Sequence, residues 1–421
     1  MIKILTVHHT TPEVIGYTTI LFRNVLRILR EKTDVHMTWV IHSPERIDTT
    51  SFEDQNTSFL DITDYKDAVE ILKKVKPNLV YVIPGFSVID YAFLIAAKQL
   101  KIKTIGGELG NFLFIKKGSG ILSRISDIFN INLNSEWKRN FLKQKFFLVK
   151  HIFLIRTYIT LKWNVIKITK NLSDILRLYL PGATEFTKFE DCDLWFVESQ
   201  KTMDTLIEHG YDKSRIKITG NPTYDLAFQK IQKLEKRDKQ KEIRVLILTM
   251  TVFGEKKKKM QKQRDLFIKG VITQINQYKK ETLLTIKIHP TNENYFDYKK
   301  IIDSIDSKLV IHQKGDLAEY LKNTDIVITP VSSTGVVFTL ISNIPIIIWN
   351  VFEVEEDVLL KNELAIECKN ENDIIHSIEK ALVFQPPIKK VDSFLSEYFF
   401  KRDGKASERI ADIMLEMIDN K

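Results

Sequence analysis

Short apolar runs alternate with stretches of helical periodicity along most of this chain, and this alternation limits the possible fold more than any other feature. The apolar runs of the first part have the length of strands and span residues 3–7, 37–42, 79–84 and 104–107. Helical patterns separate them at residues 15–31, 66–76 and 91–100. Strands that alternate with helices form a parallel sheet covered on both faces. We therefore predict an α/β unit here.

The alternation stops at about residue 115. It resumes at residue 192 and again, after a charged stretch, at residue 244. Strands are predicted at 192–199 and 215–221, and the charged stretch 233–242 has no apolar face and is predicted to be a linker. A second series of strands follows, at 244–250, 283–290, 309–313, 325–330 and 344–350. The chain ends in an amphipathic helix at 406–418, for which Ser407 is a suitable N-cap.

These patterns predict two doubly wound α/β units within the 421 residues. We assign residues 1–235 to the first unit, with an insertion at 115–180, residues 243–395 to the second, and residues 396–421 to a C-terminal helix. In such sheets ligands bind beyond the carboxyl ends of the strands, where the strand order reverses. Because the two units are expected to face each other, the cleft between them is the natural site.

The positive charge of the chain is concentrated in one segment. The net charge is +9, and residues 137–173 carry nine Lys or Arg and no Asp or Glu. Mixed with aromatic and aliphatic residues, this composition is typical of an amphipathic helix pair at a membrane surface. A hairpin packed on its own domain, or a surface for nucleic acid or acidic polysaccharide, are the alternatives. We favour peripheral binding to the inner face of the membrane, a cytoplasmic enzyme, and no nucleic-acid partner.

Several classes of protein are disfavoured by what the sequence lacks. The first residues, MIKILTV, indicate a buried strand rather than a signal peptide, and no run of 18 uncharged apolar residues predicts a spanning helix. Cys192 and Cys368 stand far apart without metal-ligand spacing, so we expect inert thiols in a reducing compartment. No Walker loop, HExxH or CxxC occurs, and we assign no metal ligand and no cofactor.

Three residues at strand ends of the first unit are candidates for chemistry. His8 and His9 follow the first strand, and Glu108 follows Gly106-Gly107 at the end of another. A carboxylate whose pKa burial raises can act as a general base, and paired glycines let the backbone approach a ligand closely. The alternatives are a capped turn for the histidines and a glycine-rich turn with a solvated Glu108.

Candidate ligand residues of the second unit also follow strands. His289-Pro290 ends one strand, and Ser332-Ser333-Thr334-Gly335 joins another strand to a helix, whose N-terminus favours anions. The alternatives are a structural histidine and a simple N-cap. Two further strand-end residues complete the predicted set of donor-binding residues: Thr251 and Asn221.

The order of these motifs resembles bacterial surface-polysaccharide enzymes of the GT-B glycosyltransferase fold, such as sialyltransferases, capsule Kdo transferases and glycerophosphotransferases. In those families the His-Pro histidine and the serine pair bind the nucleotide phosphates, which implies this role for His289, Ser332, Ser333 and Thr334. The segment Arg215–Asp225 also resembles that superfamily, which includes UDP-GlcNAc 2-epimerases. The segment 402–410 is similar to a C-terminal signature of surface-carbohydrate transferases.

Two departures from the resemblance bear on function. Many GT-B enzymes hold the ribose with a Glu on the helix after the serine motif, but Phe338 stands there, and we consider Glu353, Glu355 or Glu356 as substitutes. The non-hydrolysing epimerases begin with Gly-Thr-Arg-Pro-Glu, whereas this chain has His9-Thr-Thr-Pro-Glu13 and lacks the Arg. Their Asp-Ser-Gly-Gly phosphate motif is also replaced, although Glu108-Leu-Gly110 resembles their Glu-Ala-Gly.

The sequence thus leaves three hypotheses, of which we favour the first and take the second as its alternative. The first is a glycosyltransferase that moves a sugar from a nucleotide-activated donor to a surface-glycan or lipid-linked acceptor. His289 and the 332–335 loop would stabilise the leaving phosphates, and Glu108, His8 or His9 would deprotonate the acceptor. The second is an isomerase of the UDP-GlcNAc 2-epimerase type. The third is a catalytically silent scaffold that binds a sugar nucleotide or a glycan.

Overall fold

The computed structural model describes most of the chain as two compact units. Unit 1 comprises Met1–Asp225 with Glu397–Lys421, and unit 2 comprises Leu226–Ser396. The boundary lies at the start of α8 (Asp225–Gln232). The described residues are 1–8, 23–43, 47–50, 53–82, 88–108, 136–177, 192–208, 210–232, 242–250, 257–289, 293–306, 308–354 and 357–419.

Unit 1 is built on a seven-stranded sheet in which all the paired strands are parallel. Its strands are β1 (Ile2–His8), β2 (Val35–Ile41), β3 (Thr57–Asp61), β4 (Leu79–Val82), β5 (Lys103–Glu108), β6 (Leu194–Val197) and β7 (Ile216–Ile218). They lie in the order β3-β2-β1-β4-β5-β6-β7. The order reverses direction at β1, which is the doubly wound arrangement expected from the alternating sequence.

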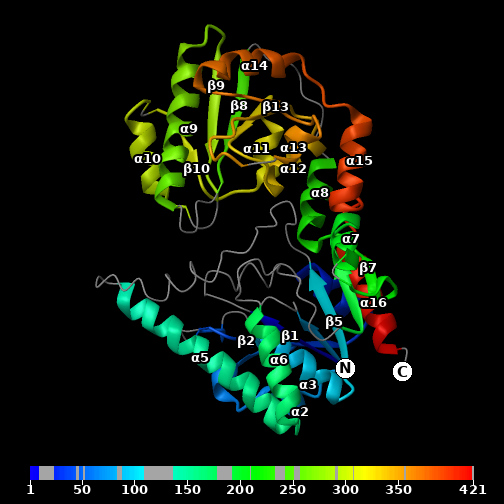
Figure 1. Cartoon of the computed structure of the whole chain (residues 1–421). Helices are drawn as coiled ribbons and strands as arrows, with labels where there is room; N and C mark the ends of the chain where they lie inside the picture. Colours follow the sequence, from blue (N-terminus) through cyan, green and yellow to red (C-terminus); the bar gives the residue numbers. More distant parts are fainter. Residues whose placement is uncertain are drawn as a thin grey trace. The chain divides into compact units, whose positions relative to one another are not determined.

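Helices cover both faces of this sheet (Figure 1). One face carries α2 (Ala68–Val75), α3 (Val88–Gln99) and, outside them, α5 (Glu136–Thr160). The other packs against helical residues 23–32 and against α16 (Ala406–Asp419), the helix at the C-terminus. Because α3 lies between the sheet and α5, nearly all of its side chains are buried. The described residues of unit 1 also form the helices η2 (Ile62–Asp64), α6 (Val165–Arg177), α7 (Gln200–Glu208), η4 (Lys213–Arg215) and η5 (Pro222–Tyr224).

Unit 2 repeats the plan with a six-stranded parallel sheet in the order β10-β9-β8-β11-β12-β13. Its strands are β8 (Ile243–Leu248), β9 (Thr282–Lys287), β10 (Ile311–His312), β11 (Ile326–Thr329), β12 (Ile346–Ile348) and β13 (Ile366–Glu367). With α8, its helices are α9 (Lys257–Gln277), α10 (Tyr295–Asp303), α11 (Leu317–Lys322), α12 (Thr334–Ile341), α13 (Val358–Lys361), η6 (Glu371–Asp373), α14 (Ile374–Val383) and α15 (Ile388–Phe399). Two Rossmann-like α/β sheets confirm the predicted fold class.

The C-terminal helix α16 is capped by a residue distant in sequence. Asp225 accepts the backbone N–H groups of Ala406 and Ser407, at 3.0 and 2.8 Å. We expected Ser407 itself to be the N-cap, and this was wrong, because the buried carboxylate of Asp225 takes that place. Burial raises the pKa of Asp225, while its bonds to Ser407 and Ala406 lower it. Arg409 adds a bond from Nε to the Thr219 carbonyl at 2.8 Å.

The predicted basic insertion stands between β5 and β6, and its described residues form α5 and α6 joined by a short turn at 161–164. Its helices α5 and α6 lie along the α2–α3 side of unit 1 (Figure 1). In the described part of the chain, no helix is long and apolar enough to cross a membrane.

Candidate functional site

The carboxyl ends of β8, β9 and β11 bring the candidate residues of unit 2 together. The strand order of this sheet reverses between β8 and β11, so the loops that follow these two strands diverge at the switch point. The first loop starts at Thr249 and the second contains Ser332 and Ser333. His289 follows β9, the other neighbour of β8. Sequence reasoning placed His289 and the serine loop at strand ends, and the register brings those ends to one edge.

A threonine fixes the backbone of His289. The His289 N–H donates to Thr249 Oγ1 at 3.0 Å, and the Thr249 N–H donates to the Lys287 carbonyl at 3.3 Å. These bonds tie the exits of β8 and β9 to each other. Lys287 is mostly buried, which lowers the pKa of its amine against the opposing effect of Asp316, and its Nζ donates to the Gln313 carbonyl at 3.4 Å. The Lys287 amine therefore lies against the loop that follows β10.

The loop after β11 is held by a buried carboxylate that sequence reasoning missed. Asp357 accepts the Ser332 backbone N–H at 2.7 Å and also the Ser332 hydroxyl. The same carboxylate caps α13 by accepting the N–H groups of Leu359 and Leu360, at 3.0 and 3.3 Å. Ser332 is 1% exposed, so its hydroxyl is engaged inside the protein. A lone Asp 25 residues downstream gives no sequence signal for this contact.

The next residue, Ser333, starts α12 without capping it. Its backbone is extended, with φ −147° and ψ 168°, and its side chain makes no capping hydrogen bond. Val336 and Val337 donate to the Ser333 carbonyl at 3.0 and 3.1 Å. The backbone N–H groups of Thr334 and Gly335 precede Val336 in the first turn of α12. Among the described contacts they have no protein acceptor, as is usual for a first helical turn. Such a turn attracts an anion.

A buried ion pair supports the same edge of the sheet. Arg264 Nη1 lies 3.2 Å from Glu293 Oε2, and the two side chains are 7% and 2% exposed. Arg264 also binds Asp265 at 2.8 Å and lies 4.7 Å above the Tyr298 ring. Glu293 follows His289 by four residues, and its carbonyl accepts from Gln313 at 2.8 Å. The pair joins α9 to the residues just before α10, and no spacing in the sequence predicts it.

The candidates of unit 1 also lie at a carboxyl edge. His8 ends β1 and Glu108 ends β5, and these strands are separated by β4 alone. The side chains of His8 and Glu108 are outside the described set, as is His9 altogether. The remaining candidates that fall there are Thr251, Pro290 and the side chain of Thr334.

Asn221 belongs to unit 1 and makes protein contacts. Its Oδ1 accepts from Thr223 N at 3.0 Å and Thr223 Oγ1 at 2.6 Å, and its Nδ2 donates to Glu198 Oε2 at 3.3 Å. Glu198 follows β6 and is 4% exposed. This buried carboxylate at the edge of the sheet was not identified from the sequence, because the predicted strand 192–199 includes it, whereas β6 ends one residue before it.

The glycine pair before Glu108 packs closely against aromatic side chains of neighbouring strands. A Cβ on Gly107 would lie 1.6 Å from the Tyr81 hydroxyl, and one on Gly106 would lie 2.8 Å from the Trp195 ring. The space above both glycines is therefore filled by aromatic side chains of neighbouring strands.

The position of the expected ribose-binding Glu is part of the core. Phe338 is 9% exposed and packs edge-on against Phe228, with ring centroids 5.7 Å apart. Among the proposed substitutes, Glu353 is exposed and binds Lys259 at 2.7 Å. Glu355 and Glu356 lie outside the described residues.

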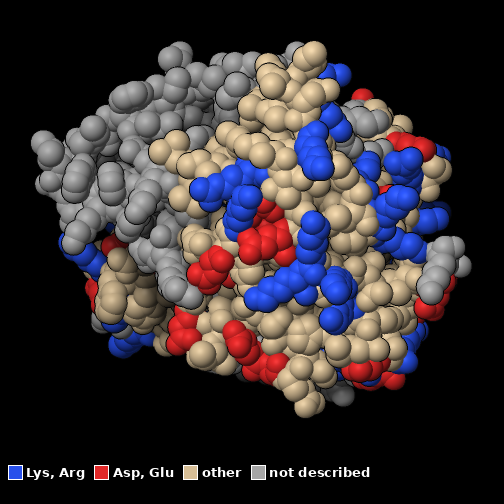
Figure 2. Space-filling model, turned by 90° about the horizontal axis from the view of Figure 1, so that it is seen from below, with Lys and Arg blue, Asp and Glu red and all other residues tan. Residues whose placement is uncertain are grey.

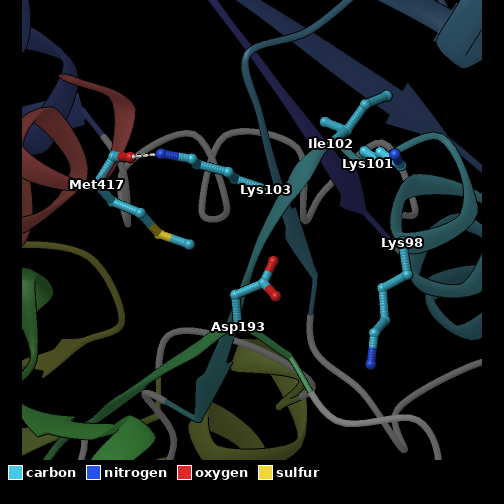
Figure 3. Close-up of a pocket in the computed structure, with 6 residues that line it drawn as sticks. All are labelled: Lys98, Lys101, Ile102, Lys103, Asp193 and Met417. Atoms are coloured by element: carbon cyan, nitrogen blue, oxygen red, sulfur yellow. Dashed lines mark hydrogen bonds between the residues drawn. The ribbon is translucent and has the colours of Figure 1, made fainter. Parts of the chain in front are cut away.

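One hollow of about 470 Å³ lies away from these edges (Figure 3). It is lined by Lys98, Lys101, Ile102, Lys103, Asp193 and Met417. Lys103 begins β5, so the hollow lies at the amino end of the strand that Glu108 ends. Lys103 Nζ donates to the Met417 carbonyl of α16, and Asp193 accepts from Thr104 N at 2.8 Å. The hollow thus marks where α16 joins the sheet.

Comparison with known proteins identifies the family. The model of the UDP-N-acetylglucosamine 2-epimerase family matches residues 191–415, more than half of the chain. The chain belongs to this family. No curated protein matches it.

Solved structures agree on the fold. The UDP-GlcNAc 2-epimerase of Methanocaldococcus jannaschii aligns over 99% of this chain and 100% of its own, with a TM-score of 0.53 and 16% identity. The Neisseria meningitidis enzyme, solved with UDP-GlcNAc, covers 99% and 100%, with a TM-score of 0.53 and 14% identity. CalG4, the calicheamicin glycosyltransferase, covers 100% and 99%, with a TM-score of 0.54 and 12% identity. The GT-B architecture is therefore shared by this chain, by epimerases and by a glycosyltransferase.

Proposed function

We propose that this protein binds a nucleotide-activated sugar and that unit 2 holds its phosphates at the carboxyl edge of the sheet. The observation that carries the proposal is the uncapped start of α12. The first-turn N–H groups of Thr334 and Gly335, with the Ser333 hydroxyl, form an anion site at the switch point. His289 would donate to a phosphate oxygen from the neighbouring strand end.

Ser332 acts in this proposal as a positioning residue. Its hydroxyl and N–H are bound to Asp357, so the ligand meets the residues after it. Asp357 holds the loop in one conformation before the ligand arrives, which reduces the entropy lost on binding.

We further propose that the reaction is isomerisation of the sugar while the nucleotide stays attached, as in a UDP-GlcNAc 2-epimerase. Family membership and the nucleotide-sugar-bound neighbour support this choice. Inverting a carbon that carries hydrogen requires removal and return of that hydrogen. Glu108, His8 and His9 at the edge of unit 1 are the candidate proton acceptors.

Glycosyl transfer is the second candidate, and a specific observation favours it. The family match begins at residue 191, so it leaves Glu108 and the His9–Glu13 segment, which lacks the epimerase Arg, outside the matched region. The match thus covers the unit proposed to hold the nucleotide and omits the residues proposed to act on the sugar. In this alternative a glycan or lipid-linked acceptor hydroxyl would be deprotonated by the same unit 1 residues.

Binding is tested by thermal shift with UDP, GDP, CDP, CMP and their sugar conjugates. A ligand at about 100 times its Kd should stabilise the wild type by about 2.7 kcal/mol. His289→Ala and Ser333→Ala should lose most of that stabilisation, whereas His376→Ala, an exposed histidine of α14, should keep it. Equal stabilisation of all four proteins would remove the phosphate site from unit 2.

The reaction is tested by mass spectrometry and anion-exchange chromatography after incubation with UDP-GlcNAc in heavy water. An epimerase gives an isomer that has gained deuterium and still carries the nucleotide. A transferase releases UDP only when an acceptor is present. Tight binding without either product would favour the catalytically silent scaffold.

A further inference from the structure

An apolar stripe runs along the outer side of α5. Leu148, Ile152, Ile155 and Ile159 are 61, 46, 37 and 62% exposed, and their spacing of four, three and four residues puts them on one face of the helix. The first turn of α6, five residues after the end of α5, adds two aliphatic side chains that are still more exposed: Val165 at 77% and Ile166 at 81%. Aliphatic side chains gathered in this way mark an interaction surface.

The opposite side of α5 is fixed to unit 1. Phe153, Leu154 and Tyr158 are at most 3% exposed. They belong to the same hydrophobic core as the buried residues of α2 and α3. Thr157 Oγ1 accepts the backbone N–H of Ala68 at 3.2 Å, and Trp163 Nε1 donates to Gln99 Oε1 at 3.0 Å. The apolar stripe therefore cannot turn inward, because its helix already buries its other face.

Cations border the stripe. Arg156, Lys162, Lys167 and Lys170 are exposed, and residues 137–173 contain no acidic side chain. Lys167 Nζ lies 3.7 Å from the centre of the Trp163 ring, which keeps that cation next to the first turn of α6. In the view from below, Lys and Arg side chains stand amid broad uncharged surface, with groups of acidic side chains also present (Figure 2). Neighbouring α2 contributes an exposed Glu70.

We propose that this surface, formed by the stripe and its bordering cations, docks onto an anionic lipid bilayer. The aliphatic side chains would enter the boundary between headgroups and acyl chains, and the cations would meet the phosphates. The proposal does not depend on which reaction the enzyme performs. It sharpens the sequence-based expectation for 137–173 by naming the face that touches lipid.

Charge selects this partner over two others. A second copy meeting the same face across a two-fold axis would bring the two sets of cations together, which opposes association. A nucleic acid would be met by aromatic and polar side chains, whereas the exposed uncharged side chains of the stripe are aliphatic. An anionic bilayer satisfies both the apolar stripe and its positive border.

The test is sedimentation of the full chain with vesicles of equal phosphatidylglycerol and phosphatidylcholine, and with vesicles of phosphatidylcholine alone. The wild type should bind the anionic vesicles far better, and added salt should weaken that binding. Equal binding to both vesicles, or to neither, would overturn the proposal.

Two pairs of variants assign the surface. Ile159→Ser/Ile166→Ser should abolish most of the binding, whereas Val383→Ser/Ile388→Ser, which alters equally exposed aliphatics of unit 2, should leave it unchanged. Lys162→Glu/Lys170→Glu should weaken the partition constant by more than about fivefold for each cation, and so by more than about 25-fold together, because each change removes a positive charge and adds a negative one. Lys279→Glu/Lys308→Glu is the matched charge control in unit 2.

Two results would reassign the surface. A wild-type dimer by light scattering that becomes a monomer in Ile159→Ser/Ile166→Ser would make a second copy the partner. An RNA oligonucleotide bound more tightly than the anionic vesicles, with loss of that binding in Lys162→Glu/Lys170→Glu, would make nucleic acid the partner.

Discussion

The two units share a strand order but place their buried polar residues differently. In unit 2 the Arg264–Glu293, Ser332–Asp357 and Thr249–His289 contacts lie at the carboxyl edge of the sheet, around the proposed phosphate site. Unit 1 has Glu198 with Asn221 at its edge, but two of its other buried carboxylates attach helices: Asp225 holds α16 and Asp67 accepts from Thr160 of α5. One fold thus uses the same interaction to shape a loop in one unit and to fasten added helices in the other.

The difference matters because a buried charge is stable only while its partner remains. Removing one member of a buried pair leaves an uncompensated charge, whereas an exposed pair contributes little. We therefore expect variants in the two units to differ in their effects on stability and on ligand binding.

The largest expected effect is on unit 2. Arg264→Ala should lower its free energy of unfolding by about 3–4 kcal/mol, because Glu293 would stay buried without a counter-charge. Lys299→Ala, which removes an exposed pair with Asp303 in the same unit, should cost less than about 0.5 kcal/mol. Urea titration followed by the fluorine signal of labelled Trp349, the single tryptophan of residues 226–396, measures unit 2. Equal losses of unfolding free energy in the two variants would mean that the buried pair stabilises the protein no more than an exposed pair does.

The next effect is pH-dependent and belongs to unit 1. Burial lowers the pKa of Lys150 on α5 from 10.5 to about 8, and Asp90 opposes this only in part. Because the folded pKa is below the unfolded one, the wild type is penalised at neutral pH and gains stability as pH rises from about 8 to 10.5.

The matched variant for that prediction is Lys150→Met, which has no such titration. The free energy of unfolding of the wild type, relative to the variant, should increase by up to about 3 kcal/mol between pH 7 and pH 10.5. The fluorine signal of labelled Trp195 reports on unit 1. A difference that stays constant with pH would show that Lys150 is solvated in the folded protein.

Much of the fold follows from local patterns in the sequence, because each strand and helix has its own periodicity. The apolar run 244–250 and the strand Ile243–Leu248 nearly coincide, and the basic segment falls between two strands as expected. The strand ends also place His289 and Ser333 correctly relative to the sheet, since parallel strands end at one edge.

The details that shape the site could not be predicted, because they join residues far apart in sequence. Asp225 meets Ser407 from 182 positions away, and nothing near Ser407 indicates that its capping role is taken. Gly107 suggested a close ligand, but Tyr81 of another strand fills the space. Phe338 stands where the resemblance implies a Glu, and its packing against Phe228, 110 positions away, has no local signal in the sequence.

The smallest expected effect on stability comes from removing a buried carboxylate. It distinguishes the carboxylate that shapes a loop in unit 2 from the one that holds a helix in unit 1. Asp357→Ala and Asp225→Ala each leave backbone N–H groups without an acceptor and should each cost about 2 kcal/mol. Only Asp357→Ala should also weaken the thermal stabilisation by the nucleotide, because only Asp357 holds the Ser332–Ser333 loop. If Asp225→Ala reduced nucleotide binding as much, loss of stability alone would explain both results. If neither did, Asp357 would serve only to cap α13, and the shape of the phosphate site would have to come from the Arg264–Glu293 segment instead.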